Sequence, residues 1–310
     1  NFHGSQIFSK KWSTMSFLHL SHQQFESDVN NDGFRDMPVG FLGAFMHRWQ
    51  FEGKKSEAKF GIKGTFADKQ GWQLGTTASD ASTPAWFAGQ KTEHLEIFIK
   101  NGYFLKNRKQ GSIGIIGQLK YHHMNNSFGL TTYDGIQRKG YFNVMYGDII
   151  KDTRHNIKTG LSFIVDDYTQ TYNDSTFLKT EIVPGAFFEY TYNQNDNFIL
   201  VSGIRGDYHN LYGPLFAPRM HAKWNIKKLS AIRLSAGRGL RVPNPYADYL
   251  SNMASNRIWV VDPNVQPEDC ISSGITYVQK FATWREVSSI SVDYFYTHFF
   301  NALLADMDQS

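Results

Sequence analysis

The chain has 310 residues, a formal net charge of +4, 19% charged residues and 15% aromatic residues. The small net charge and the scattered basic residues argue against a nucleic-acid partner. No apolar run is long enough for a membrane-spanning helix, and the mean hydropathy of −0.43 does not test for a barrel, whose apolar residues stand at alternate positions. Cys270 is the single cysteine, which excludes an internal disulfide framework and a cysteine-based metal cage.

Apolar and polar residues alternate along almost the whole chain, which predicts β-strands with one apolar face and one polar face. Between residues 288 and 296, for example, Ile290, Val292 and Tyr294 share one face. We expect about 13 strands of roughly 10–14 residues, the length that a tilted membrane strand needs. In chain order they are 10–21, 39–51, 57–67, 92–105, 111–123, 139–150, 155–168, 181–193, 197–208, 215–226, 229–238, 269–283 and 287–300. The only helix candidate, 246–253, lies inside a loop.

The predicted connections alternate between short and long. The short ones are 52–56, 106–110, 151–154, 194–196, 227–228 and 284–286; the long ones are 22–38, 68–91, 124–138, 169–180 and 239–268, with 209–214 as a brief exception. This alternation places all tight turns at one end of the sheet, as in outer-membrane barrels. The fold class that we expect is therefore all-β, a transmembrane antiparallel up-and-down β-barrel.

Aromatic residues lie beside the short turns, as expected for the aromatic girdle of a membrane barrel. They are Trp49, Phe51, Tyr103, Phe104, Tyr190, Tyr192, Trp224 and Trp284. A soluble sandwich or propeller also has alternating strands, but those strands are usually nearer five or six residues long. The strand lengths therefore favour the membrane barrel.

Three stretches carry a resemblance to a known family. They are Pro218–Tyr246, which contains Ile232-Arg233-Leu234-Ser235-Ala236-Gly237-Arg238-Gly239; Asp262–Glu268 with the later strand Val292–Thr297; and Val183–Tyr190. They resemble the late-barrel strands of TonB-dependent outer-membrane receptors, particularly those of Bacteroidetes. Leu240 stands where that family usually has Phe, and Val265 where it usually has Leu.

The resemblance implies a barrel of about 22 strands around a plugged lumen. The family also has an N-terminal plug domain with a TonB box and an aromatic terminal residue, none of which is visible in this sequence. We therefore interpret residues 1–310 as a barrel portion without the plug and the C-terminal strands.

The function that the resemblance implies is TonB-dependent uptake of a scarce ligand, such as an iron-siderophore, haem or cobalamin, across the bacterial outer membrane. Its partners would be outer-membrane lipid, a small-molecule or metal-chelate ligand, and TonB through the missing plug. The alternative is a passive porin or a surface-adhesion barrel. We found no catalytic motif and expect no enzyme activity and no required cofactor.

Two groups of residues are candidates for ligand contacts. The long loop after the predicted strand 229–238 carries arginine and aromatic residues that suit an anionic or aromatic ligand at the mouth: Arg238, Arg241, Asn244, Tyr246, Tyr249, Arg257 and Trp259. An equally supported interpretation is that this loop folds against its neighbours. Alternation places a second group, Glu189, Arg205, Asp207 and Arg233, on the lumen-facing side.

Two stretches contain possible metal ligands. Asp28, Asn30, Asp32, Phe34 and Asp36 match the spacing of a calcium loop with Gly33 at its sixth position, although the twelfth position is Val39 instead of Glu. Such a site would hold a structural Ca²⁺, and the alternative is a solvated, turn-forming loop. His122 and His123 are adjacent on a strand and point to opposite faces, which disfavours a shared ion.

Overall fold

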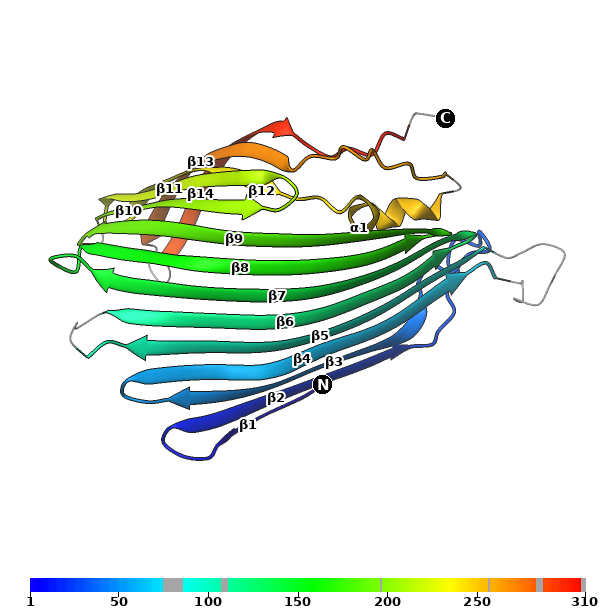
Figure 1. Ribbon diagram of the computed structural model, residues 1–310, viewed down its shortest axis with the longest axis horizontal. Helices are drawn as coiled ribbons and strands as arrows, with labels where there is room; N and C mark the ends of the chain where they lie inside the picture. Colours follow the sequence, from blue (N-terminus) through cyan, green and yellow to red (C-terminus); the bar gives the residue numbers. More distant parts are fainter. Residues whose placement is uncertain (75–85, 107–110, 196, 256, 283–286, 308–310) are drawn as a thin grey trace.

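The structure is a computed structural model that describes residues 1–74, 86–106, 111–195, 197–255, 257–282 and 287–307. Fourteen antiparallel strands form one sheet, and their order in the sheet is their order in the chain (Figure 1). The strands are β1 Phe2–Ile7, β2 Trp12–Gln23, β3 Val39–Glu52, β4 Ser56–Trp72, β5 Phe87–Phe104, β6 Ser112–Phe128, β7 Thr131–Ile149, β8 His155–Tyr172, β9 Ser175–Gln194, β10 Phe198–His209, β11 Gly213–Lys227, β12 Ser230–Arg241, β13 Glu268–Ala282 and β14 Val287–Asn301.

Among the described residues, helical structure is confined to the connection between β12 and β13, where α1 (Pro245–Asp248) is followed by a short 3-10 helix, η1 (Leu250–Ala254). Within the described ranges, no helix has the length and apolar character needed to cross a membrane.

The sheet is strongly curved (Figure 1). Its convex face is apolar. Cross-strand pairing places Ile62, Ile97, Leu119, Val165 and Ile182 in one row on this face, with only Gly140 between Leu119 and Val165. Leu119 remains 64% exposed because no second layer of described residues covers it. A sandwich would bury such a row against a second sheet. The exposed row instead fits a wall that faces lipid.

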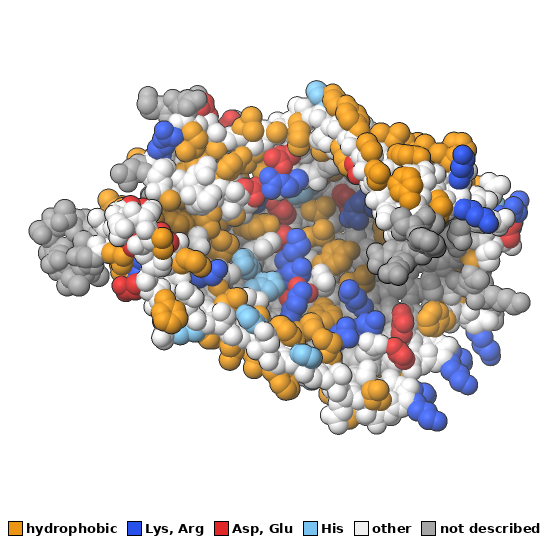
Figure 2. Space-filling model, turned by 180° about the vertical axis from the view of Figure 1, so that it is seen from behind, with side chains coloured by type: hydrophobic (Ala, Val, Ile, Leu, Met, Phe, Trp, Pro, Cys, Tyr) orange, Lys and Arg blue, Asp and Glu red, His pale blue; other side chains and the backbone are white. Residues whose placement is uncertain are grey.

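The concave face is polar. Figure 2 shows Lys, Arg, Asp, Glu and His side chains gathered in the hollow of the sheet. Because successive side chains of a strand point to opposite faces, the same alternation that makes the outside apolar makes the inside charged.

Odd-numbered strands end at one end of the sheet, which we call the turn end, and even-numbered strands end at the opposite end, which we call the loop end (Figure 1). At the turn end, Trp12 contacts Trp49 and Phe51, with ring centroids 6.4 and 5.0 Å apart. Trp49 and Phe51 belong to the expected girdle, and Trp12, which was not predicted, extends it. Trp284, the turn 284–286 and parts of the connections 68–91, 106–110 and 194–196 lie outside the described residues.

Each of the 13 expected strands corresponds to one of β2–β14, and the sequence analysis missed β1. The six residues of β1 contain four consecutive polar or small residues, His3 to Gln6, and so show no clear alternation. The pairing of β1 with β2 supplies the order that its own sequence does not predict.

The expected long loops 124–138 and 169–180 are wrong. Strands β6 and β7 continue to Phe128 and Thr131, and β8 and β9 to Tyr172 and Ser175. The remaining connections are tight turns with positive φ at Gly129 (58°) and Asn173 (49°). Polar stretches favour a loop in the sequence, but strand pairing satisfies the backbone whether or not the side chains are apolar.

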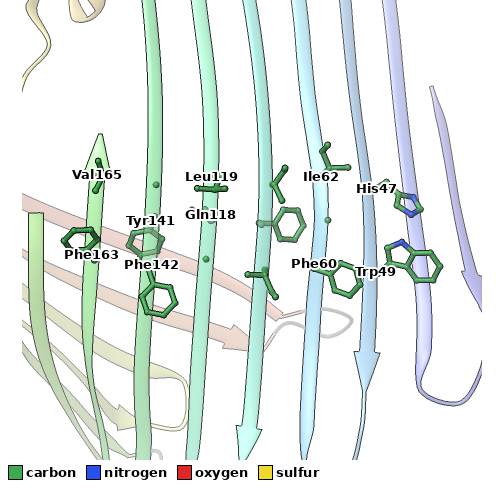
Figure 3. A pocket seen from close by; sticks show the side chains of 16 residues that line it. His47, Trp49, Phe60, Ile62, Gln118, Leu119, Tyr141, Phe142, Phe163 and Val165 are labelled. Carbon is green, nitrogen blue, oxygen red and sulfur yellow. The ribbon is translucent and has the colours of Figure 1, made fainter. Parts of the chain in front are cut away.

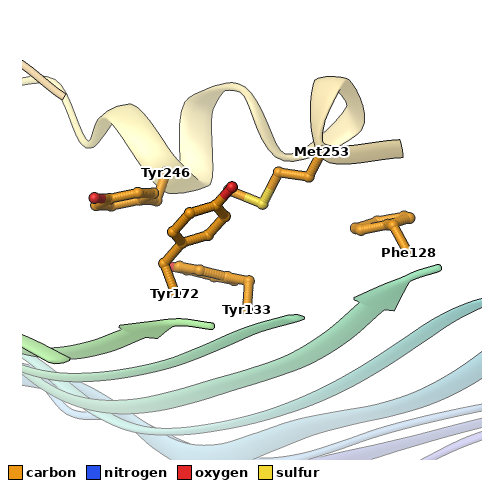
Figure 4. Close-up of a cluster of buried hydrophobic side chains, with 5 residues drawn as sticks. All are labelled: Phe128, Tyr133, Tyr172, Tyr246 and Met253. Carbon is orange, nitrogen blue, oxygen red and sulfur yellow. The ribbon is translucent and has the colours of Figure 1, made fainter. Parts of the chain in front are cut away.

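These extended strands support the one cluster of buried hydrophobic side chains among the described residues. Phe128, Tyr133 and Tyr172 come from the loop-end tips of β6, β7 and β8, and Tyr246 and Met253 come from the connection between β12 and β13 (Figure 4). The hydrophobic core therefore lies at the mouth of the curved sheet, where a loop docks on the wall.

Candidate ligand mouth and lumen

The connection between β12 and β13 docks through Tyr246. Its ring stacks on Tyr172 and Phe177, each with centroids 5.3 Å apart, and on Tyr133 at 6.3 Å. Burial raises the pKa of Tyr246, since the phenolate would lose its hydration. Pro245 begins α1 and fixes the backbone just before this ring.

Tyr249 and Trp259 extend the same contact. Their rings stack with centroids 5.8 Å apart, the Tyr249 hydroxyl donates to the Leu303 carbonyl at 2.8 Å, and the Trp259 amide donates to the Tyr172 hydroxyl at 3.1 Å. The loop therefore folds against its neighbours, as the second sequence interpretation expected. Tyr246, Tyr249 and Trp259 hold the loop in place, and whether they also contact a ligand stays a prediction.

Two arginines of this region, Arg238 and Arg241, are paired with acids at the start of β13. Arg238 donates through Nε and Nη2 to the two carboxylate oxygens of Asp269, at 2.8 and 2.7 Å. Arg241 binds Glu268 through Nε at 2.5 Å and Asp248 through Nη1 at 3.1 Å. The hydrogen bond from Arg241 holds the pKa of Glu268 below its ordinary value.

The other two predicted mouth residues are less engaged. Arg257 is exposed. Among the described residues, Oδ1 of Asn244 is buried without a hydrogen-bond partner. Whether either side chain contacts a ligand stays a prediction.

A row of charged residues that the sequence analysis did not identify crosses the concave face. Cross-strand pairing places side chains of six consecutive strands, β4 to β9, at one level: Lys63, Glu96, Lys120, Lys139, Asp166 and Glu181. We call this set the charged row.

The carboxylates of the charged row are buried and paired. Glu96 is 3% exposed, and one of its oxygens lies 3.2 Å from Lys63 Nζ and 3.4 Å from Lys120 Nζ. Asp166 is 1% exposed and binds Lys139 Nζ at 2.6 Å. Lys120 and Lys139 face each other directly, and the two carboxylates beside them offset the repulsion.

The predicted lumen residues form two further ion-paired groups. Glu189 on β9 lies between Lys158 (3.5 Å) and Arg219 (2.7 Å), and Arg205 donates to both oxygens of Asp207 at 2.7 Å. Arg233 is exposed on β12, opposite Lys223 of β11. Pairing places Glu189, Arg205 and Asp207 on the same face as the charged row.

The histidines separate as expected. His122 lies on the charged face, whereas His123 lies on the other face and contacts Asp134 at 2.9 Å. The structure also brings His94 opposite His122, with ring centroids 5.6 Å apart, although the two are 28 positions apart in the sequence. Only the register of β5 and β6 could have revealed this pair.

The acidic loop between β2 and β3 is folded around its own backbone. Asp28 accepts hydrogen bonds from the amides of Asp32 and Gly33, both at 3.1 Å, and Asp36 accepts one from Val29 at 2.6 Å. Asn30 donates to Asp32 at 2.9 Å, and Phe34 pairs with Gln73 at the end of β4. No group of three or more His, Cys, Asp or Glu side chains in the described part of the chain is arranged to hold a metal ion.

A depression of about 880 Å³ lies on the apolar face of the sheet (Figure 3). Gly140, which has no side chain, lies between Leu119 and Val165; a Cβ there would meet only Leu119, at 3.8 Å. The absence of a side chain at Gly140 thus leaves the surface open, although the backbone there would tolerate a larger residue. Because its other walls include Phe60 and Phe142, the depression suits acyl chains better than a hydrophilic ligand.

The comparison with protein families decides the assignment. The profile described as TonB dependent receptor-like, beta-barrel matches residues 8–310, nearly the whole chain. The chain belongs to this family. The family consists of transport receptors of the outer membrane, so the apolar convex face of this receptor barrel faces the lipid of that membrane and its charged face lines the lumen. No curated protein matches the chain.

Several solved structures share the fold. The siderophore receptor PirA from Pseudomonas aeruginosa superposes with a TM-score of 0.71 at 10% identity, over 99% of this chain and 53% of that one. The alcaligin receptor FauA from Bordetella pertussis gives 0.64 at 11% identity over 96% and 48%, and the yersiniabactin receptor FyuA from Yersinia pestis gives 0.65 at 12% identity over 96% and 51%. The chain thus spans about half the length of these receptors.

Proposed function

We propose that this receptor barrel is the wall of a TonB-dependent importer that takes up a scarce metal chelate of the siderophore class. The family match over residues 8–310 is the observation that carries the proposal. The solved relatives named above are receptors for siderophores, which is why we place iron-siderophores before haem and cobalamin.

The lumen charges support this role. The charged row contains three cations and three anions, so it has no net charge. A neutral row of paired charges on the lumen wall can dock a protein domain without attracting ions of one sign. We propose that this surface contacts a plug domain, through which TonB acts, and that the barrel itself carries out no catalysis.

At the loop end, Arg257 is the residue that we assign to ligand contact, because its side chain is exposed. A guanidinium at the mouth suits the carboxylate or catecholate oxygens of an iron chelate.

The test is uptake of radioactive iron, supplied as a panel of ferric siderophores, into cells that express the full-length gene. We expect uptake of at least one chelate, and we expect that uptake to stop when TonB is deleted or the inner membrane is de-energised. Uptake that continues without TonB and rises in proportion to concentration would overturn the proposal and support a passive porin.

A pair of variants tests the mouth. Arg257→Ala should raise the KM for uptake about tenfold, the effect of losing one charge-assisted hydrogen bond. Arg154→Ala is the matched control, because Arg154 lies in the turn-end connection between β7 and β8, where it is paired with Asp152. An equal effect of both variants would contradict the assignment of Arg257.

A further inference from the structure

Arg35 is a buried arginine whose pairing is incomplete. It lies in the connection between β2 and β3, with its guanidinium carbon 3.7 Å from the ring centroid of Trp72, at the loop end of β4. Its side chain is 1% exposed, and Nη2 donates to Glu26, which is 61% exposed. Among the described residues, Nε and Nη1 have no hydrogen-bond partner. A buried cation with unsatisfied donors is costly, so this geometry favours a further anion.

Arg35 lines a cavity of about 530 Å³ on the outside of the barrel. The strand residues that line it include His22, Phe41, Phe66, Asp68, Gln70 and Trp72. His22 pairs with Phe41 and Phe41 with Asp68, so these side chains share one face of the sheet. That face continues along β4 to Ile62 of the lipid-facing row, since successive even-numbered residues of the strand point the same way.

The cavity lies at the edge of the apolar band that is nearer the loop end. Below it on the same face are Leu18 and Phe45, both exposed, and at its level β5 carries the ion pair between Lys91 and Glu93 (2.9 Å). Phe41 and Phe66 form its apolar side, with ring centroids 6.1 Å apart. The cavity thus lies where the apolar band meets the polar residues of the loop end.

We propose that this cavity binds the phosphate headgroup of an outer-leaflet lipid. The phosphate accepts hydrogen bonds from Arg35, and the first segment of an acyl chain lies over Phe41 and Phe66. The apolar side, continuous with the lipid-facing band, favours a lipid over a free anion. The lipid site is independent of the proposed uptake function, because it faces away from the lumen.

Two acids near the cavity set the conditions for binding. Asp68 lines the cavity and accepts a hydrogen bond from Gln70 at 3.2 Å. Glu26 competes with the phosphate for the guanidinium, and because it is mostly exposed it can rotate into water when the lipid binds. Removing the charge of Glu26 should therefore strengthen lipid binding.

The test is native mass spectrometry of the full-length receptor in detergent with phosphatidic acid as the probe. Diacylglycerol, which lacks the phosphate, and inorganic phosphate, which lacks the chains, are the two comparison ligands. We expect phosphatidic acid to bind at least about tenfold more tightly than either. Equal binding of inorganic phosphate would overturn the lipid proposal in favour of a soluble anion, and equal binding of diacylglycerol would show that the phosphate is not recognised.

Substitutions locate the site. Arg35→Gln should weaken phosphatidic acid binding about tenfold and Arg35→Lys should weaken it less, whereas Glu26→Gln should strengthen it. Arg154→Gln, at the turn end, is the matched control and should change nothing. If Arg35→Gln does not fold, the other two variants decide: unchanged binding in both Arg35→Lys and Glu26→Gln overturns the proposal. Uptake of the iron chelate should remain unchanged in Glu26→Gln, which separates this result from the proposed transport function.

Discussion

Replacing Tyr246 with alanine should release the loop between β12 and β13 from the barrel wall. The ring is buried and stacks on three others, those of Tyr133, Tyr172 and Phe177. Aromatic pairs contribute about 0.5–1.5 kcal/mol each beyond the area that they bury. Three such pairs give about 3 kcal/mol, which is also the low end for truncating a buried aromatic residue to alanine. The equilibrium for opening the loop should therefore shift about 100-fold.

Hydrogen exchange measures this shift directly. The Trp259 amide is hydrogen-bonded to the Tyr172 hydroxyl, so its protection reports on docking of the loop. In Tyr246→Ala that amide should exchange about 100-fold faster, while amides in the middle of β10 stay unchanged. Tyr246→Phe is the control and should behave like the parent protein, because it keeps the ring and the stacking. Unchanged protection of Trp259 in Tyr246→Ala would refute the reasoning.

Three further predictions concern charges. Asp166→Asn should lower the free energy of unfolding in detergent by about 3 kcal/mol, because it leaves Lys139 in the lumen without its buried partner. The control, Asp167→Asn on the opposite face, should lower it by only about 0–1 kcal/mol. Equal losses in the two variants would contradict the assignment of the two faces. The pKa of Glu268 is lowered from its ordinary 4.5 by Arg241, so the stability from this pair is present above pH 4.5 and is lost as the pH falls through the lowered pKa. Protection of the loop amides from hydrogen exchange should therefore fall in acid, and Glu268→Gln should remove this dependence on pH. An acid-induced loss of protection that persists in Glu268→Gln would contradict the assignment to this pair. Finally, if the loop between β2 and β3 binds calcium, a chelator should lower the Tm of the parent protein and leave Asp28→Asn unchanged; no bound calcium on titration would remove the idea.

The alternation of side chains was sufficient to predict strands β2–β14 and the division into a lipid-facing and a lumen-facing side. Alternation is local, because the direction of a side chain relative to its strand neighbours follows from the extended backbone alone. For the same reason, alternation predicts that His122 and His123 lie on opposite faces, and they do. Strand ends were less predictable at the loop end, because the hairpins there carry many polar residues and show no clear alternation.

Contacts across strands needed the tertiary structure. Lys63 and Glu96 are 33 positions apart and meet only because β4 and β5 pair in one particular register. The docking of Tyr246 on Tyr172 and of Arg35 on Trp72 depends on how two loops fold back over strands distant in the sequence. The sequence by itself thus determined which face each side chain occupies, since that depends on adjacent residues. Only the tertiary structure decided which charged and aromatic groups meet on that face, since this depends on register and on loop docking.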